Sequence, residues 1–151
     1  SVGGFDNKFY GGEDTALCIK LINARKKILY HPEVVVYHHR RHFPEGYLTQ
    51  VGNVGMHRGY FVKKYPSTSL RPSYFMPLFG IITTILLLLL SVVFPPLIWL
   101  GVFLYLLGIV DAIKVSNRRV AVILPLCIYL SHFSYAYNFV KGLLFIKHLE
   151  R

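Results

Sequence analysis

Two acidic side chains, Glu13 and Asp14, stand where a glycine-rich loop is followed by a helical pattern. A carboxylate in such a position can act as a general base, taking a proton from a hydroxyl as that hydroxyl attacks an electrophilic carbon. Acids also occur at helix N-termini for a purely structural reason, because they cap free N–H groups and suit the helix dipole. For an isolated acid pair the capping role is favoured, so the flanking segments decide between the two interpretations.

A cluster of histidine and arginine follows the second of two short apolar segments, 28–30 and 34–37. Segment 34–37 is apolar on both faces, which predicts a buried strand. Polar groups at the end of such a strand gather at the active sites of α/β folds. The cluster consists of His38, His39, Arg40, Arg41 and His42.

Each member of this cluster has two interpretations. Alternation along a strand sends His38 and His39 to opposite faces, so at most one of them points at a given metal ion or diphosphate. The alternative for both is an ordinary solvated histidine. Arg40 and Arg41 can hold a diphosphate by charge-assisted hydrogen bonds, and they can equally hold lipid headgroups.

Two helical patterns position these groups. Apolar residues at helical spacing predict a helix over about 13–26, which the acid pair opens and three basic residues close. A second pattern predicts an amphipathic helix over 45–64, in which Gly52, Gly55 and Gly59 share a side that a neighbour can approach closely. A basic amphipathic helix just before an apolar region is typical of a helix on a membrane surface.

The second half of the chain carries the pattern of membrane spans. No charged residue occurs from Pro72 to Val110, a stretch of roughly 58 Å as helix, about twice the thickness of a bilayer core. We therefore predict spans at about 75–94 and 96–112, with a proline pair at the turn, and a third candidate at 120–140. The third carries a polar stripe of Ser131, Tyr135 and Asn138, so it either spans or lies partly in the interface.

Composition agrees with a membrane protein that has a basic side. The chain has 151 residues, of which 54% are hydrophobic, and a net charge of +10. An anionic partner is expected, such as lipid headgroups or a nucleotide diphosphate. No nucleic-acid module is recognisable, so we expect no nucleic-acid partner. Lysine and arginine flank both ends of the predicted hairpin, which predicts that this side is cytosolic. Cys18 and Cys127 predict two free thiols.

Residues 2–42 resemble the second half of a GT-A domain in family 2 glycosyltransferases. The resemblance follows the order of a "GGFD" loop, an "ED" pair at a helix start, a short strand, a Pro turn and a Val-rich strand that ends in His and Arg. Among these enzymes the chain most resembles the membrane-bound exopolysaccharide transferases of the succinoglycan-biosynthesis type. The resemblance implies an α/β fold, the C-terminal half of a Rossmann-like GT-A domain, over 1–42. An interfacial helix and linker over 43–72 and two to three transmembrane helices over 73–151 would follow.

The resemblance also implies roles for particular residues. Asp14 would be the catalytic base, with Glu13 as its neighbour. Other groups would bind the acceptor (Gly4, Phe5, Asp6 and Gly12), bind diphosphate or metal (His38, His39, Arg40 and Arg41) or mark the interfacial helix (Gln50 and Arg58). For Asp6, an Asx-turn role is the more favoured interpretation. A divalent metal, Mg²⁺ or Mn²⁺, is implied for the full-length enzyme.

The expected function is inverting transfer of a sugar from a nucleotide-sugar donor to a lipid-linked or polysaccharide acceptor, at the cytosolic face of the plasma (inner) membrane. The residues after Gln50 depart from the "QxxRW" pattern of processive synthases, which favours single additions. No Asp-x-Asp occurs, so we expect a fragment that is inactive alone. The alternative is a non-catalytic membrane scaffold or transporter accessory protein, which leaves the ordered motif of residues 2–42 unexplained.

Overall fold

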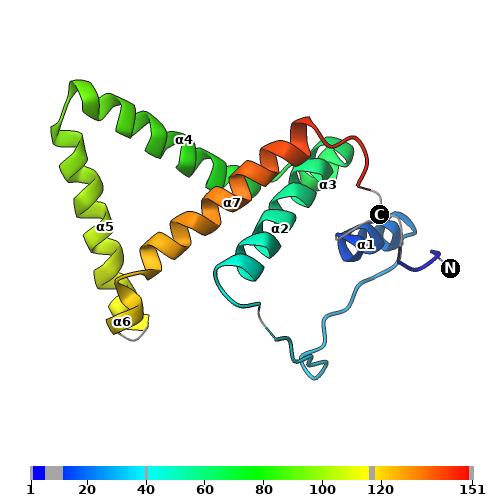
Figure 1. Ribbon diagram of the computed structural model, residues 1–151. Coiled ribbons are helices and arrows are strands. Elements are labelled where there is room, and N and C mark those ends of the chain that lie inside the picture. Colours follow the sequence, from blue (N-terminus) through cyan, green and yellow to red (C-terminus); the bar gives the residue numbers. More distant parts are fainter. Residues whose placement is uncertain (1, 6–11, 40, 116–117, 150–151) are drawn as a thin grey trace.

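A computed structural model describes residues 2–5, 12–39, 41–115 and 118–149 (Figure 1). The regular structure in these ranges is helical. It consists of α1 (Glu13–Asn23), α2 (Glu45–Lys64), α3 (Pro66–Ser69), α4 (Pro72–Val93), α5 (Pro96–Val115), α6 (Arg118–Ala121) and α7 (Leu124–Leu144). The fold therefore divides into a first part with α1 and a long extended segment, and a second part built from long helices.

The expected α/β fold is wrong. The described residues contain no strand and no sheet. Segments 28–30 and 34–37 run outside regular structure with their side chains in solvent, so that Tyr30 is 90% and Val36 84% exposed. A strand is stable only when its backbone N–H and C=O groups pair with a neighbour, and the described part of the chain offers these segments none. The Val-rich pattern indicates a preference for burial, but it does not supply the sheet that would bury it.

Helix α1 forms where the sequence predicts a helix, but it ends at Asn23. Arg25 takes a left-handed conformation, with φ of 54°. The N–H groups of Arg25 and Lys26 then donate to the carbonyls of Ile22 and Leu21, both at 2.9 Å. This is a Schellman arrangement, which satisfies the last carbonyls of a helix and stops it.

Helices α2 and α7 pack side by side and run parallel, through the glycine side predicted for α2 (Figure 1). A Cβ added to Gly55 would collide with the carbonyl oxygen of Tyr135, and one added to Gly59 with that of Phe139. From the other helix, a Cβ on Gly142 would collide with the carbonyl oxygen of Met56. Small residues at such spacing let two backbones approach closely, so glycine is required at this crossing.

Polar contacts extend the same crossing. The Ser134 hydroxyl donates to the Leu48 carbonyl at 2.8 Å, and the Lys63 amine donates to the Ile146 carbonyl at 2.6 Å. Asn138 keeps its amide on its own helix by donating to the Ser134 carbonyl at 2.9 Å. Two residues of the predicted polar stripe, Tyr135 and Asn138, thus lie at this crossing, together with Ser134, which was not part of the predicted stripe.

Helices α4 and α5 diverge from the turn at Phe94–Pro95, and α7 runs back from the far end of α5 toward α2 (Figure 1). By length and composition, two helices in the described part of the chain can cross a membrane: Pro72–Val93, with mean hydropathy 2.5, and Pro96–Lys114, with 2.1. Their apolar windows are only 11% and 6% buried. Apolar side chains this exposed need a covering other than water, and a bilayer provides one.

Candidate functional site

Two faces of helix α2 contact candidate functional residues. The start of α1, which carries the acid pair, packs against the first of these faces. Gly12 has a φ of 73°, and a Cβ there would lie 2.7 Å from Cε2 of Phe61 and 3.8 Å from Cβ of His57. One turn further on, Ala16 is buried in a cluster with Tyr60, Phe61 and Leu149. The start of α1 is therefore held against the second half of α2.

The two carboxylates have different environments. Asp14 is exposed, and its Oδ1 accepts a hydrogen bond from the Thr15 N–H at 2.7 Å. Glu13 is partly buried, and its buried Oε2 has no hydrogen-bond partner among the described residues. Asp14 thus contributes to the first turn of the helix and is also reachable by a substrate hydroxyl, which a general base must be.

Replacing Gly12 by Ala should detach α1 from α2. The new methyl group meets the Phe61 ring and also sits on a left-handed backbone, which costs roughly 1–2 kcal/mol for an L-residue. Faster hydrogen exchange at the amides of residues 16–23 would report the loss. Gly4→Ala is the matched control, because Gly4 has a similar φ of 68° and nothing within 4 Å of the added Cβ. Equal exchange in both variants would show that the Phe61 contact does not hold α1.

The structure does not bring the other expected site residues to the acid pair. Phe5 is exposed, and an added Cβ at Gly4 would touch nothing among the described groups. Asp6 and Arg40 lie outside the described residues. His38, His39 and Arg41 are exposed on the extended segment before α2, because the strand that was to present them does not form.

The divalent metal expected for the full-length enzyme has no ligand cluster among the described residues. No group of three or more His, Cys, Asp or Glu side chains converges among them, and a site for Mg²⁺ or Mn²⁺ is built mainly from oxygen ligands. His38 and His39 have no carboxylate beside them in the described segment. No chemical step can be assigned to a metal held by these side chains.

The second face of α2 carries Arg58, which the sequence analysis assigned to the interfacial helix. The central guanidinium carbon lies 4.5 Å from the ring centroid of Tyr74 and 5.9 Å from that of Tyr135. Arg58 lines a pocket of about 370 Å³ between α2, α4 and α7, and its other lining residues are Tyr47, Val51, Pro77, Ile128, Ser131, His132 and Tyr135. Gln50, which is half-buried, is not among them.

Sequence reasoning missed the partners of Arg58. It identified a polar stripe of Ser131, Tyr135 and Asn138, but it did not connect the stripe with α2. A polar stripe on one helix and a glycine side on another were the available signals, because both mark helix faces that avoid lipid. Their combination would have placed Arg58 close to Tyr135.

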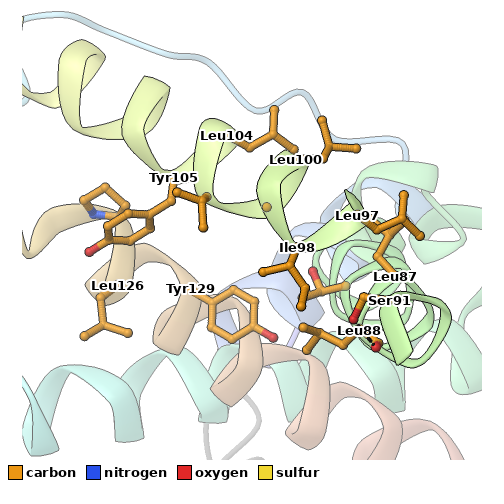
Figure 2. Close-up of a pocket in the computed structure, with 14 residues that line it drawn as sticks. Leu87, Leu88, Ser91, Leu97, Ile98, Leu100, Leu104, Tyr105, Leu126 and Tyr129 are labelled. Carbon is orange, nitrogen blue, oxygen red and sulfur yellow. Dashed lines mark hydrogen bonds between the residues drawn. The ribbon is translucent and has the colours of Figure 1, made fainter. Parts of the chain in front are cut away.

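A larger pocket, about 580 Å³, lies between α4, α5 and α7 (Figure 2). Leucine and isoleucine supply half of the 14 residues that line it, as Figure 2 shows. Of its hydroxyl groups, Tyr105 donates to the Val122 carbonyl at 3.0 Å and Ser91 to the Leu88 carbonyl at 2.6 Å. These two donors are already used and most of the lining is apolar, so the pocket suits hydrocarbon.

Lys64, the last residue of α2, carries a positive charge. Burial lowers the pKa of Lys64, but hydrogen bonding and electrostatic interaction with Tyr60 and Tyr65 outweigh it, so the pKa lies above its ordinary value. The amine is 5.3 Å from the Tyr60 ring centroid and 5.6 Å from that of Tyr65. A lysine that stays charged just before an apolar helix favours a position at the membrane surface.

Comparison with known proteins adds one similarity. Over 144 residues, 93% of this chain, the sequence is 26% identical to the dolichyl N-acetyl-alpha-D-glucosaminyl phosphate 3-beta-D-2,3-diacetamido-2,3-dideoxy-beta-D-glucuronosyltransferase of Methanococcus voltae. The chain spans 41% of the length of that relative. No protein-family model and no solved structure matches the chain.

This similarity is to a glycosyltransferase, and it agrees with that part of the resemblance. It gives no support to the succinoglycan-biosynthesis type. Together, the distant transferase relative and the two apolar helices are consistent with a membrane-associated transferase.

Proposed function

We propose that this chain is the membrane-associated part of an inverting glycosyltransferase that transfers a sugar from a nucleotide-sugar donor to a lipid-linked acceptor. The observation that carries the proposal is the similarity, over 93% of the chain, to an enzyme whose name describes sugar transfer to a dolichyl-phosphate-linked N-acetylglucosamine. The two exposed apolar helices support a location beside such an acceptor.

Asp14 is the proposed catalytic base. As the acceptor hydroxyl oxygen forms its bond to the anomeric carbon of the donor, the bond from that carbon to the diphosphate breaks. The hydroxyl proton passes to the carboxylate of Asp14, and the nucleoside diphosphate leaves with the electron pair. Exposure of Asp14 at the start of α1 supports this role, since an incoming hydroxyl can reach it.

The remaining assignments belong to the same proposal. Glu13 sets the position of the acid pair, and the loop residues Gly4, Phe5, Asp6 and Gly12 approach the acceptor. His38, His39, Arg40 and Arg41 are proposed to contact the diphosphate, and a divalent cation would be held by other groups. The basic side of the chain is proposed to face the cytosol at the plasma (inner) membrane.

The proposal predicts a measurable activity. Membranes containing the full-length gene product should label a lipid-extractable product when supplied with radiolabelled nucleotide sugars and polyisoprenyl-phosphate-linked N-acetylglucosamine. The donor panel should include nucleotide-linked hexoses and hexuronates, and membranes lacking the gene product are the control. If the lipid fraction stays at the control level with every donor, the transferase proposal fails and the non-catalytic scaffold is favoured.

A further inference from the structure

The pocket of Arg58 combines a cation with the polar groups of Tyr135 and His132. No carboxylate forms an ion pair with Arg58 in the described part of the chain. Tyr74 and Tyr135 place their rings near the guanidinium instead, which holds the cation without neutralising it. The N–H groups at the edge of a guanidinium then remain suited to two oxygens of one oxyanion.

Tyr135 provides a second sign of a ligand. The residue is only 6% exposed, and it lines the pocket. Its hydroxyl interacts with Arg58 through a weak hydrogen bond and electrostatically, and it forms no hydrogen bond of good geometry with any group among the described residues. A buried hydroxyl without a partner costs free energy, and a bound ligand oxygen would remove that cost.

His132 adds a third polar group to the same pocket. Its Nδ1 lies 2.9 Å from the Ile128 carbonyl oxygen, which can only accept, so Nδ1 carries the proton. The other ring nitrogen, Nε2, is left for a ligand. Arg58 and Tyr135 therefore supply donors around one space of about 370 Å³, and Nε2 of His132 supplies an acceptor, which suits a protonated oxygen of the ligand.

An apolar pocket adjoins this polar one and identifies the ligand as an amphiphile. It measures about 430 Å³, and it shares Tyr47, Ile128 and Ser131 with the pocket of Arg58. Beyond the shared residues its lining is apolar, with Phe43 and Leu124 among the side chains. A free phosphate or a nucleotide would leave this apolar surface unused, whereas a hydrocarbon chain would cover it.

The position along α4 agrees with a lipid headgroup. Tyr74 and Pro77 belong to the first two turns of α4, the apolar helix that begins at Pro72. The start of a membrane span lies at the level of the lipid phosphates, where aromatic and basic side chains gather.

We infer that the pocket formed by Arg58, Tyr135 and His132 binds the phosphate of a lipid, with the lipid chain in the adjoining apolar pocket. Naming this lipid as the polyisoprenyl phosphate of the acceptor rests on the proposed function. The binding site itself rests on the geometry of α2, α4 and α7.

Binding of a polyisoprenyl monophosphate to the full-length protein in nanodiscs tests the inference. Arg58→Gln should weaken binding by about tenfold to a hundredfold, because a charge-assisted hydrogen-bonded pair is lost. Tyr135→Phe, which removes only the hydroxyl, should weaken it several-fold. Arg71→Gln is the matched control, since Arg71 directs its Nε to the Thr68 carbonyl at 3.4 Å and does not line the pocket.

Two further probes decide the ligand class. The matching polyisoprenol, which lacks the phosphate, should bind weakly and without dependence on Arg58, and inorganic phosphate should not compete at equal concentration. Competition by inorganic phosphate would overturn the assignment to a lipid. Equal loss of binding in Arg58→Gln and Arg71→Gln would overturn the site. Thermal unfolding of each variant shows that the fold is kept, and Tyr135→Phe gives the answer if Arg58→Gln does not fold.

These outcomes separate the inference from the proposed function. Arg58-dependent lipid binding without any sugar transfer would leave a lipid-phosphate site in a protein of another function. Sugar transfer that is insensitive to Arg58→Gln, with lipid binding also unchanged, would refute the site and leave the transferase standing.

Discussion

Replacing Asp14 by Asn in the full-length protein should lower sugar transfer by about a hundredfold to ten-thousandfold, the usual contribution of a general base. The amide has nearly the size of the carboxylate, and its oxygen can still accept the hydrogen bond that Asp14 receives from the Thr15 N–H. The amide cannot take a proton at neutral pH, so the substitution should lower the rate of sugar transfer. The measurement is kcat at saturating donor and acceptor.

Glu33→Gln serves as the control for this variant. Glu33 is another exposed acid, on the extended segment between α1 and α2, and its replacement also removes one negative charge. Circular dichroism and hydrogen exchange at residues 16–23 would show whether α1 is kept. Near-normal kcat in Asp14→Asn would mean that the acid pair has only a structural role, and the assignment of the base would fail.

A second large effect is expected for Gly59→Ala, which should destabilise the protein by about 3 kcal/mol or separate α2 from α7 altogether. The added Cβ collides with the Phe139 carbonyl oxygen and lies 2.8 Å from the Leu143 backbone nitrogen. Backbone atoms inside a helix cannot move aside as a side-chain end can, so the two helices must move apart. The buried Phe139 ring would then lose its close packing.

Gly101→Ala is the matched control for the helix crossing. Gly101 lies inside α5, where an added Cβ meets nothing within 4 Å. The same change there should be neutral or slightly stabilising, since Ala is the better helix former. Thermal unfolding in a fixed detergent compares the two variants. Equal midpoints for Gly59→Ala and the unchanged protein would contradict the close approach of α2 and α7.

Local patterns predicted the helices well, because a helix satisfies its own backbone. Helix α2 has the bounds 45–64 that its periodicity predicted, and its glycine side does meet a close neighbour. The third apolar segment was predicted at 120–140, but the main helix there, α7, covers Leu124–Leu144 and has Pro125 in its first turn. Proline favours a helix start, since its missing N–H would be unpaired there anyway.

Patterns that depend on distant partners were interpreted less well. The apolar run at 34–37 predicted a buried strand, but burial and pairing require a sheet that the described residues do not contain. Arg58 was noticed for its position on α2, yet its contacts with Tyr74 and Tyr135 depend on how three helices meet. The role of Asp14 follows from the family resemblance, and its geometry shows only that the carboxylate is accessible.

The parallel pairing of α2 with α7 has a consequence for biosynthesis. The contact between Leu48 and Ser134 joins residues 86 positions apart, and the α4–α5 hairpin lies between them. At about 5–20 residues per second, a ribosome needs about 4 to 17 s to make that interval. Throughout this time the glycine face of α2 is without its partner. The nascent chain must therefore complete its hairpin before this helix pair can assemble, and a chaperone or the membrane surface would have to shelter α2 until then.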